Sequence, residues 1–189
     1  MRKILEEKNL RDKRVLLRLD LNVPLDNGKI TDATRIDKIL PTLNYLINQN
    51  SKIIILSHVG RPKGKIISEL SLEPVRKDME SKISQNIKLI KKDIYEMKNK
   101  DLFQNIDEKI IMFENIRFYN QEEKNDYEFA SLLASFADIY VNDAFSCSHR
   151  VHASIVDITK FLPSYSGLQF DLEVNALKKI TSEIQKPIT

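Results

Sequence analysis

Arginine and histidine side chains recur in four separate segments of this 189-residue chain. The residues concerned are Arg35, His58, Arg61, Arg117, His149, Arg150 and His152. A guanidinium group binds carboxylates and phosphates through paired hydrogen bonds, and an imidazole adds a further donor. These residue types therefore favour binding of a small anion that carries several negative charges.

The segment with the strongest signal is Ser57-His58-Val59-Gly60-Arg61-Pro62-Lys63-Gly64, which contains two of the four glycines of the chain. Gly60 allows the backbone to approach a ligand closely, and Pro62 fixes the exit of the loop. A histidine alone at such a position is more often a structural hydrogen-bonding residue. An arginine three residues later favours an anion clamp instead.

Asp20 and Asn22 follow an apolar run that Pro24 ends. Their side chains can position hydroxyl or carboxylate groups of a ligand, or can orient a nearby arginine. The alternative is an ordinary turn in which both side chains cap their own backbone.

Arg35 falls in the first turn of a helix that we expect to start at Thr31-Asp32. A cation there opposes the helix dipole, and a bound anion would compensate for it. The alternative is an exposed arginine paired with Asp32 or Asp37.

Two further kinds of chemistry fit the last segment less well. His149 and His152 are spaced as two zinc ligands on a helix, but no third ligand has a suitable spacing, and Arg150 between them would repel a cation. Cys147 beside His149 could act as a nucleophile, although the arginines fit an electrostatic clamp better. We therefore predict no metal ligand. Glycine-rich nucleotide-binding motifs and the hydrolase nucleophile motif are also absent from the sequence.

Short apolar runs alternate with helical patterns along the chain. Strands are predicted over residues 15–19, 52–56, 86–90, 109–113 and 138–141, and helices over 36–47, from a Ser71 cap to 83, from an Asp126 cap to 136, and over 167–182. Several strands are apolar on both faces, as in a covered parallel sheet. We expect an α/β, doubly wound, mainly parallel sheet with helices on both faces, whose carboxyl edge brings the polar segments together.

Composition limits the compartment and the partners. The net charge of +3 is too small to indicate nucleic acid, and a protein that bound RNA through its lysines would need stacking aromatic residues among them. Cys147 is the only cysteine, so an intramolecular disulfide is excluded, and no apolar stretch is long enough to span a membrane. We expect a soluble cytoplasmic protein.

The chain resembles the amino-terminal, phosphoglycerate-binding domain of phosphoglycerate kinase. The resemblance rests on five segments in the family's order: Arg18 to Pro24, Gly28 to Ile36, Ser57 to Gly64, Glu114 to Phe118, and Asp138 to Ser154. It implies a Rossmann-like fold and a two-domain glycolytic enzyme. That enzyme transfers a phosphoryl group between 1,3-bisphosphoglycerate and Mg-ADP, giving 3-phosphoglycerate and Mg-ATP, and runs in reverse in gluconeogenesis.

The resemblance also implies roles for individual residues. Asp20 and Asn22 would contact the hydroxyl and carboxyl end of the glycerate, and Arg35 would be catalytic, stabilising charge on the phosphoryl group in flight. The residues around the C3 phosphate would be His58, Gly60, Arg61, Arg117, His149 and Arg150. The family usually has Gly-Thr-Ala where this chain has Ser146-Cys147-Ser148, which makes the geometry of that loop less certain.

The resemblance finally implies that half of an enzyme is present. Residues 1–166 would form the phosphoglycerate-binding domain, and 167–189 an interdomain helix and the truncated start of the nucleotide-binding domain, with a strand beginning near Pro187. The missing domain would bind Mg-ATP or Mg-ADP, so this chain alone would be an inactive monomer whose partners are the substrate and that domain. The alternative is a stand-alone anion-binding module.

Overall fold

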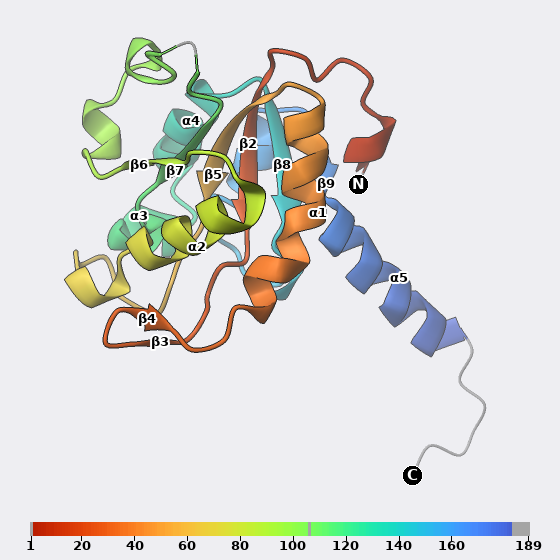
Figure 1. Ribbon diagram of the computed structural model, residues 1–189. Helices are drawn as coiled ribbons and strands as arrows, with labels where there is room; N and C mark the ends of the chain where they lie inside the picture. The colour runs from red at the N-terminus through yellow and green to blue at the C-terminus, as the bar shows by residue number, and fades with distance from the viewer. Residues whose placement is uncertain (1, 106, 183–189) are drawn as a thin grey trace.

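The computed structural model describes residues 2–105 and 107–182, and a seven-stranded parallel sheet forms the centre of this part of the chain (Figure 1). The strands are β1 Arg2–Lys3, β2 Arg14–Leu19, β5 Lys52–Leu56, β6 Lys88–Ile90, β7 Ile110–Phe113, β8 Ile139–Asp143 and β9 Ser164–Ser166. Their order across the sheet is β1-β9-β8-β2-β5-β7-β6, and every neighbouring pair is parallel. The carboxyl ends of β2, β5, β7 and β8 therefore share one edge of the sheet.

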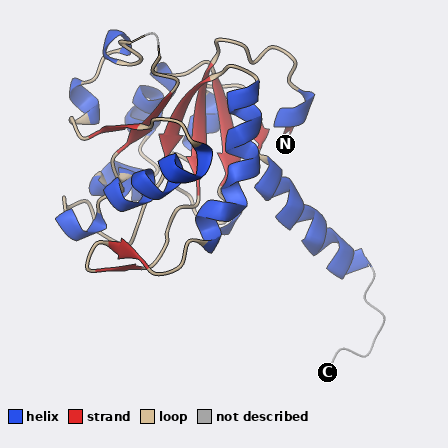
Figure 2. Cartoon of the chain, in the orientation of Figure 1, coloured by secondary structure: helices blue, strands red, loops and turns tan. Residues whose placement is uncertain are grey.

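Helices cover both faces of this sheet, as Figure 2 shows. The α-helices are α1 Thr34–Asn48, α2 Glu73–Ile83, α3 Asn120–Glu123, α4 Tyr127–Ser135 and α5 Leu168–Ser182. The 3-10 turns are η1 Ile4–Glu6, η2 Ser68–Leu70, η3 Ile94–Glu96, η4 Asn99–Asp101, η5 Ile116–Phe118, η6 Phe145–Cys147 and η7 Asp157–Lys160. The predicted α/β fold with a parallel sheet is confirmed.

The two faces of the sheet bury two separate apolar cores. In β2, Val15, Leu17 and Leu19 pack with α1 and α2, whereas Leu16 packs with α4 on the opposite face. Successive side chains of a strand point to opposite faces, so a strand buried on both sides must be apolar at consecutive positions. Arg18 has the same parity as Leu16 and is also fully buried. An arginine thus lies at the carboxyl end of a core strand.

The beginnings of the helices differ in detail from prediction. Asp126 caps α4 as predicted, because its carboxylate accepts the Phe129 N–H at 2.8 Å. The Ser71 cap was one residue early: Leu72 occupies the capping position of α2, and the Ser71 hydroxyl accepts the Glu73 N–H at 3.2 Å from one residue further out. The predicted start of α1 was also early, since Asp32 precedes the helix and accepts the Thr34 N–H at 2.8 Å.

Several short elements were not predicted. The hairpin of β3 (Leu25–Asp26) and β4 (Lys29–Ile30) turns at Asn27 and Gly28, whose φ angles of 47° and 72° are those of a two-residue hairpin turn. The edge strand β1 and its neighbour β9, which lies between β1 and β8, were missed because they are short and mainly polar.

Hydrogen bonds at the beginning of α5, the last described helix, hold it to the rest of the fold. The Leu168 N–H donates to Thr42 Oγ1 at 2.9 Å, and the Phe170 N–H donates to Asp143 Oδ1 at 2.8 Å. The rest of the helix extends away from the sheet in Figure 1 and exposes Leu172, Leu177 and Ile180. The strand predicted near Pro187 lies outside the described residues.

No helix in the described part of the chain combines the length and the apolar character that a membrane crossing requires.

Candidate functional site

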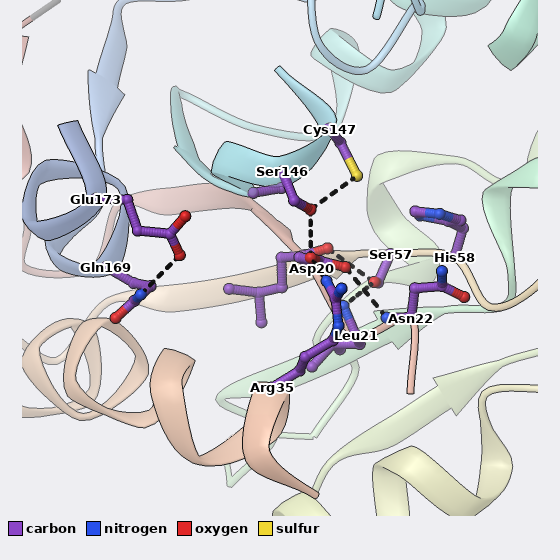
Figure 3. A network of polar contacts seen from close by, with 12 residues as sticks. Asp20, Leu21, Asn22, Arg35, Ser57, His58, Ser146, Cys147, Gln169 and Glu173 are labelled. Atoms are coloured by element: carbon purple, nitrogen blue, oxygen red, sulfur yellow. Dashed lines mark hydrogen bonds and ion pairs between the residues drawn. The ribbon is translucent and has the colours of Figure 1, made fainter. Parts of the chain in front are cut away.

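Asp20 and Arg35 form an ion pair at the carboxyl edge of the sheet (Figure 3). The first turn of α1 supplies the Arg35 guanidinium, and the loop after β2 supplies the Asp20 carboxylate. The Ser146 hydroxyl donates to the same carboxylate from η6. Asp20 therefore orients an arginine, which is one of the two roles predicted for it.

The alternative pairing predicted for Arg35 is wrong. Asp32 accepts hydrogen bonds from Thr34, and Asp37 pairs with Lys82 at 2.5 Å. Arg35 nevertheless keeps 47% of its side chain exposed, so the guanidinium remains accessible from solvent.

The backbone of Gly60 connects this ion pair region to a buried arginine. The Gly60 N–H donates to Asn22 Oδ1 at 2.8 Å, and the Gly60 carbonyl accepts from Arg117 Nη1 at 3.3 Å. Gly60 has a φ of +65°, and a Cβ there would lie 2.7 Å from Leu70 Cδ2. A side chain at this position would be strained both by the left-handed backbone and by the contact. The turn predicted as the alternative is also present in part, because Asp20 Oδ1 accepts the Asn22 N–H at 3.3 Å.

Beside Gly60, four basic side chains are buried together. Arg18, His58, Arg117 and His152 are at most 7% exposed, and with the half-buried Arg150 they form what we name the basic cluster. Arg18 Nη2 lies 3.0 Å from His58 Nδ1. A guanidinium can only donate, so His58 Nδ1 accepts and the neutral ring carries its proton on Nε2.

The basic cluster suppresses protonation of its own histidines. Burial, and then the charges of Arg18 and Arg117, lower the pKa of His58 far below its ordinary value. Burial, and then the charge of Arg117, lower the pKa of His152 to about 4. The pKa of Arg117 is lowered as well, mainly by burial. Each of these shifts shows that the cluster holds positive charge where water is scarce.

Hydrogen-bond donors of the basic cluster outnumber the acceptors around them. Among the described residues, Arg117 Nε, Arg117 Nη2 and His152 Nδ1 are buried without a hydrogen-bond partner. The Glu123 carboxylate lies 3.6 Å from Arg117 Nε, which is close enough for an ion pair but too long for a hydrogen bond. An anion with several oxygens would supply the acceptors that these donors lack.

The remaining predicted residues lie outside these contacts. Arg61 and His149 are exposed and make no hydrogen bond or ion pair with other described residues. Arg150 is close enough to lower the pKa of both His58 and His152. The structure thus brings His58, Arg117 and Arg150 together and leaves Arg61 and His149 free to reach a ligand.

The list of predicted site residues omitted two members of the cluster, Arg18 and His152. Arg18 had a sequence signal, because it interrupts the apolar run Val15 to Leu19 at a position whose neighbours are all core residues. His152 was counted among the basic residues that favour an anion and was weighed as a zinc ligand, but it was given no individual role at the site. In the part of the chain that the structure describes, no group of three or more potential ligands gathers in a way that could hold a metal ion.

The unusual triplet Ser146-Cys147-Ser148 forms the turn η6 and its end. Cys147 is buried, with its sulfur 3.7 Å from Ser146 Oγ. Ser148 Oγ accepts from Asn142 Nδ2 at 3.0 Å and donates to the Ala144 carbonyl at 3.0 Å. The two serine hydroxyls thus hold this turn through side-chain hydrogen bonds, and the Ser146 hydroxyl also donates to Asp20.

Arg35 borders two neighbouring cavities. One, of about 310 Å³, is also lined by Asp20 and Ser146, and the other, of about 570 Å³, by Asn22 and Gly60. A third cavity, of about 390 Å³, is mainly apolar and lies beside Phe113 and Tyr119. It contains none of the predicted site residues, so the two cavities that Arg35 borders are the better candidates for an anionic ligand.

Known proteins resemble this chain along nearly its whole length. The family model described as phosphoglycerate kinase matches residues 5–189. The chain is 49% identical over 185 residues to the phosphoglycerate kinase of Wolbachia pipientis subsp. Culex pipiens (strain wPip), and 44% identical over 185 residues to that of Bartonella bacilliformis. In both cases the match covers 98% of this chain and 46% of the relative.

Solved structures give the same result. The phosphoglycerate kinase of Coxiella burnetii matches with a TM-score of 0.83 and 36% identity, covering 94% of this chain and 44% of that one. The enzyme of Pyrococcus horikoshii matches with a TM-score of 0.86 and 28% identity, covering 99% and 47%. The chain spans about half the length of these relatives, and it belongs to the phosphoglycerate kinase family.

Proposed function

We propose that this chain is the substrate-binding half of a phosphoglycerate kinase and that it binds 3-phosphoglycerate or 1,3-bisphosphoglycerate. The observation that carries this proposal is the basic cluster, in which two buried N–H groups of Arg117 lack acceptors and the buried His152 Nδ1 has no hydrogen-bond partner. A phosphate group supplies three acceptor oxygens and about two negative charges, which matches both deficits.

Each candidate residue has a role in this proposal. The C3 phosphate binds at the basic cluster, with the exposed Arg61 and His149 closing over it from the loops. Asp20 and Asn22 hold the hydroxyl and carboxyl end of the glycerate. Arg35 stabilises the charge of the phosphoryl group during transfer, because such a reaction depends on positioning and charge neutralisation more than on covalent chemistry.

The nucleotide belongs to the part of the family's proteins that this chain does not span. We assign residues 1–166 to the substrate domain and 167–189 to the connection with a nucleotide-binding domain that would hold Mg-ATP or Mg-ADP. The exposed apolar side chains of α5 are consistent with such a connection. The proposal includes a cytoplasmic monomer that takes part in glycolysis.

A coupled assay tests the proposal. The chain alone should form no ATP from 1,3-bisphosphoglycerate and Mg-ADP, and addition of the separately produced carboxyl-terminal half of a relative should restore ATP formation. An Arg35→Met variant in the same mixture should bind 3-phosphoglycerate but give little turnover. Substrate binding without recovery in the mixture would favour a stand-alone anion-binding module, and turnover by the chain alone would contradict the assignment of domains.

A further inference from the structure

A fully buried carboxylate lies directly beneath the basic cluster. Glu122, in the short helix α3, has no exposed surface. Its Oε1 accepts the Ser154 hydroxyl at 2.6 Å, and its Oε2 accepts the Ser154 N–H at 2.9 Å. Both oxygens of one carboxylate thus hold one serine, and a buried carboxylate is retained only where such partners satisfy it.

Ser154 connects Glu122 to Arg18 through two hydrogen bonds of its hydroxyl group. The Ser154 oxygen accepts the Arg18 Nε–H at 3.0 Å, so its own proton must point to Glu122. Arg18 in turn donates to His58 Nδ1 at 3.0 Å. The four side chains are therefore joined by hydrogen bonds that run outward from Arg18, through Ser154 to Glu122 on one side and to His58 on the other.

Glu122 also fixes the segment that carries His152. Its backbone carbonyl accepts the Ala153 N–H at 2.9 Å, next to the Ser154 N–H held by its side chain. His152 Nδ1 lies 3.8 Å from Glu122 Oε1. Two members of the basic cluster, Arg18 and His152, thus depend on one residue that lies behind them.

We propose that Glu122, acting through Ser154 and Arg18, is a positioning residue that holds His58 in the orientation that binds a phosphate group. The inference rests on the proposed function, because it assigns the support of the same anion site. Glu122 does not touch the anion itself. Arg18 is fully buried, and its Nε, Nη1 and Nη2 all donate to protein acceptors, so it acts through His58, whose Nδ1 it holds as an acceptor while Nε2 keeps the proton.

When Glu122 is replaced by a neutral residue, the loss of its charge and the loss of its positioning role predict opposite changes in the affinity for the anion. Removal of a negative charge beneath a cationic site would by itself strengthen binding of an anion. Glu122→Gln leaves one of the two Ser154 donors without an acceptor, which loosens Arg18 and, through it, His58, and should weaken binding. The sign of the change in affinity therefore separates the two effects.

Calorimetric titration with 3-phosphoglycerate measures that sign on four proteins: the unchanged chain, Glu122→Gln, Ser154→Ala and the double variant. We expect each single variant to bind about tenfold more weakly, as for loss of one hydrogen bond to a charged group. The double variant should bind about as weakly as Ser154→Ala, because both substitutions break the same series of hydrogen bonds between Glu122 and Arg18. In ¹H–¹⁵N spectra, the Arg18 Nε–H signal should be protected from exchange in the unchanged chain and lost in both single variants.

Glu80→Gln is the matched control, because Glu80 also accepts a buried backbone N–H, from Ile87 at 2.7 Å, but lies on α2 away from the site. It should leave the affinity and the Arg18 signal unchanged. Unchanged or tighter binding by Ser154→Ala or Glu122→Gln, or a hundredfold loss in the double variant, would overturn the inference. Absence of binding by the unchanged chain would instead contradict the proposed function.

Discussion

Replacement of Arg117 by methionine should make the free protein more stable while it removes ligand binding. Arg117 is 2% exposed, and the only hydrogen bond of its side chain within the described residues is a long one, at 3.3 Å, to the Gly60 carbonyl. Methionine is unbranched, flexible and only slightly smaller in volume, so it can fill much of the same buried space without any donor to satisfy. A residue kept for binding rather than for folding should behave in this way.

The size of the expected gain in stability follows from the two donors of Arg117 that lack a partner, Nε and Nη2. Each buried donor without an acceptor costs about 1 to 3 kcal/mol, and loss of the Gly60 hydrogen bond costs about 1 kcal/mol in the opposite direction. The ion pair with the largely solvated Glu123 contributes little. We therefore expect a net gain of about 1 to 5 kcal/mol, which for a chain of this size is a rise in Tm of roughly 2 to 20 °C.

Thermal unfolding with and without 3-phosphoglycerate provides the assay. At a ligand concentration of about one hundred times Kd, the unchanged chain should gain about 2.7 kcal/mol, and Arg117→Met should gain nothing. Arg76→Met is the control, because Arg76 forms ion pairs with Glu73 at 2.7 Å and with Glu80 at 2.5 Å on α2. It should lose stability and keep the ligand response. Destabilisation of Arg117→Met by more than about 1 kcal/mol would refute the reasoning, since Arg117 would then be a structural residue.

Two further predictions concern pH and backbone conformation. The pKa of His152 is lowered to about 4 from the ordinary 6.5, so the folded state stays neutral while the unfolded state takes up a proton. As the pH falls from 6.5 to 4, the free energy of unfolding should therefore decrease by about 1.4 kcal/mol per pH unit on account of His152. Urea unfolding of His152→Gln should have a correspondingly shallower pH dependence. An unchanged slope would mean that His152 is protonated in the folded protein. Gly60→Ala should lose roughly 1 to 2 kcal/mol and bind 3-phosphoglycerate more weakly, since its φ is +65° and its Cβ would lie 2.7 Å from Leu70. Gly28→Ala, with a φ of +72° but no atom within 4 Å, should lose less stability and keep its affinity, and equal effects at both glycines would contradict the proposed contact.

The central sheet could be predicted because its strands are buried on both faces. Burial requires apolar residues at consecutive positions, as in Ile53, Ile54 and Ile55, and such runs are readily recognised in a sequence. The short strands β1 and β9, at one side of the sheet, lack such a run. In β9 only Tyr165 is apolar, and pairing with β8 rather than composition makes the segment a strand.

The candidate site was predictable to the extent that its residues follow strand ends. Asp20, His58 and Arg117 belong to loops at one edge of the sheet, and parallel topology brings these loops together. Which residues are buried was not predictable from the same pattern. Arg18 is completely buried inside a strand, whereas Arg61 is exposed in a loop, because tertiary packing decides which cations lose their water.

Glu122 could not be identified from the sequence at all. It is followed by Glu123 in a polar stretch that reads as a solvated helix face. Only the packing of α3 against the segment that contains Ser154 buries one carboxylate and leaves the next one exposed.

The central claim is that distant basic residues form one site for a phosphorylated acid. A titration of the ¹⁵N-labelled chain with 3-phosphoglycerate, followed by ¹H–¹⁵N spectra, tests it most directly. The account predicts saturable shifts at a single site, confined to the loops after β2, β5, β7 and β8 and to the first turn of α1. Shifts that avoid Arg35, His58, Arg117 and Arg150, or that spread over the lysine-rich surface without saturating, would contradict it.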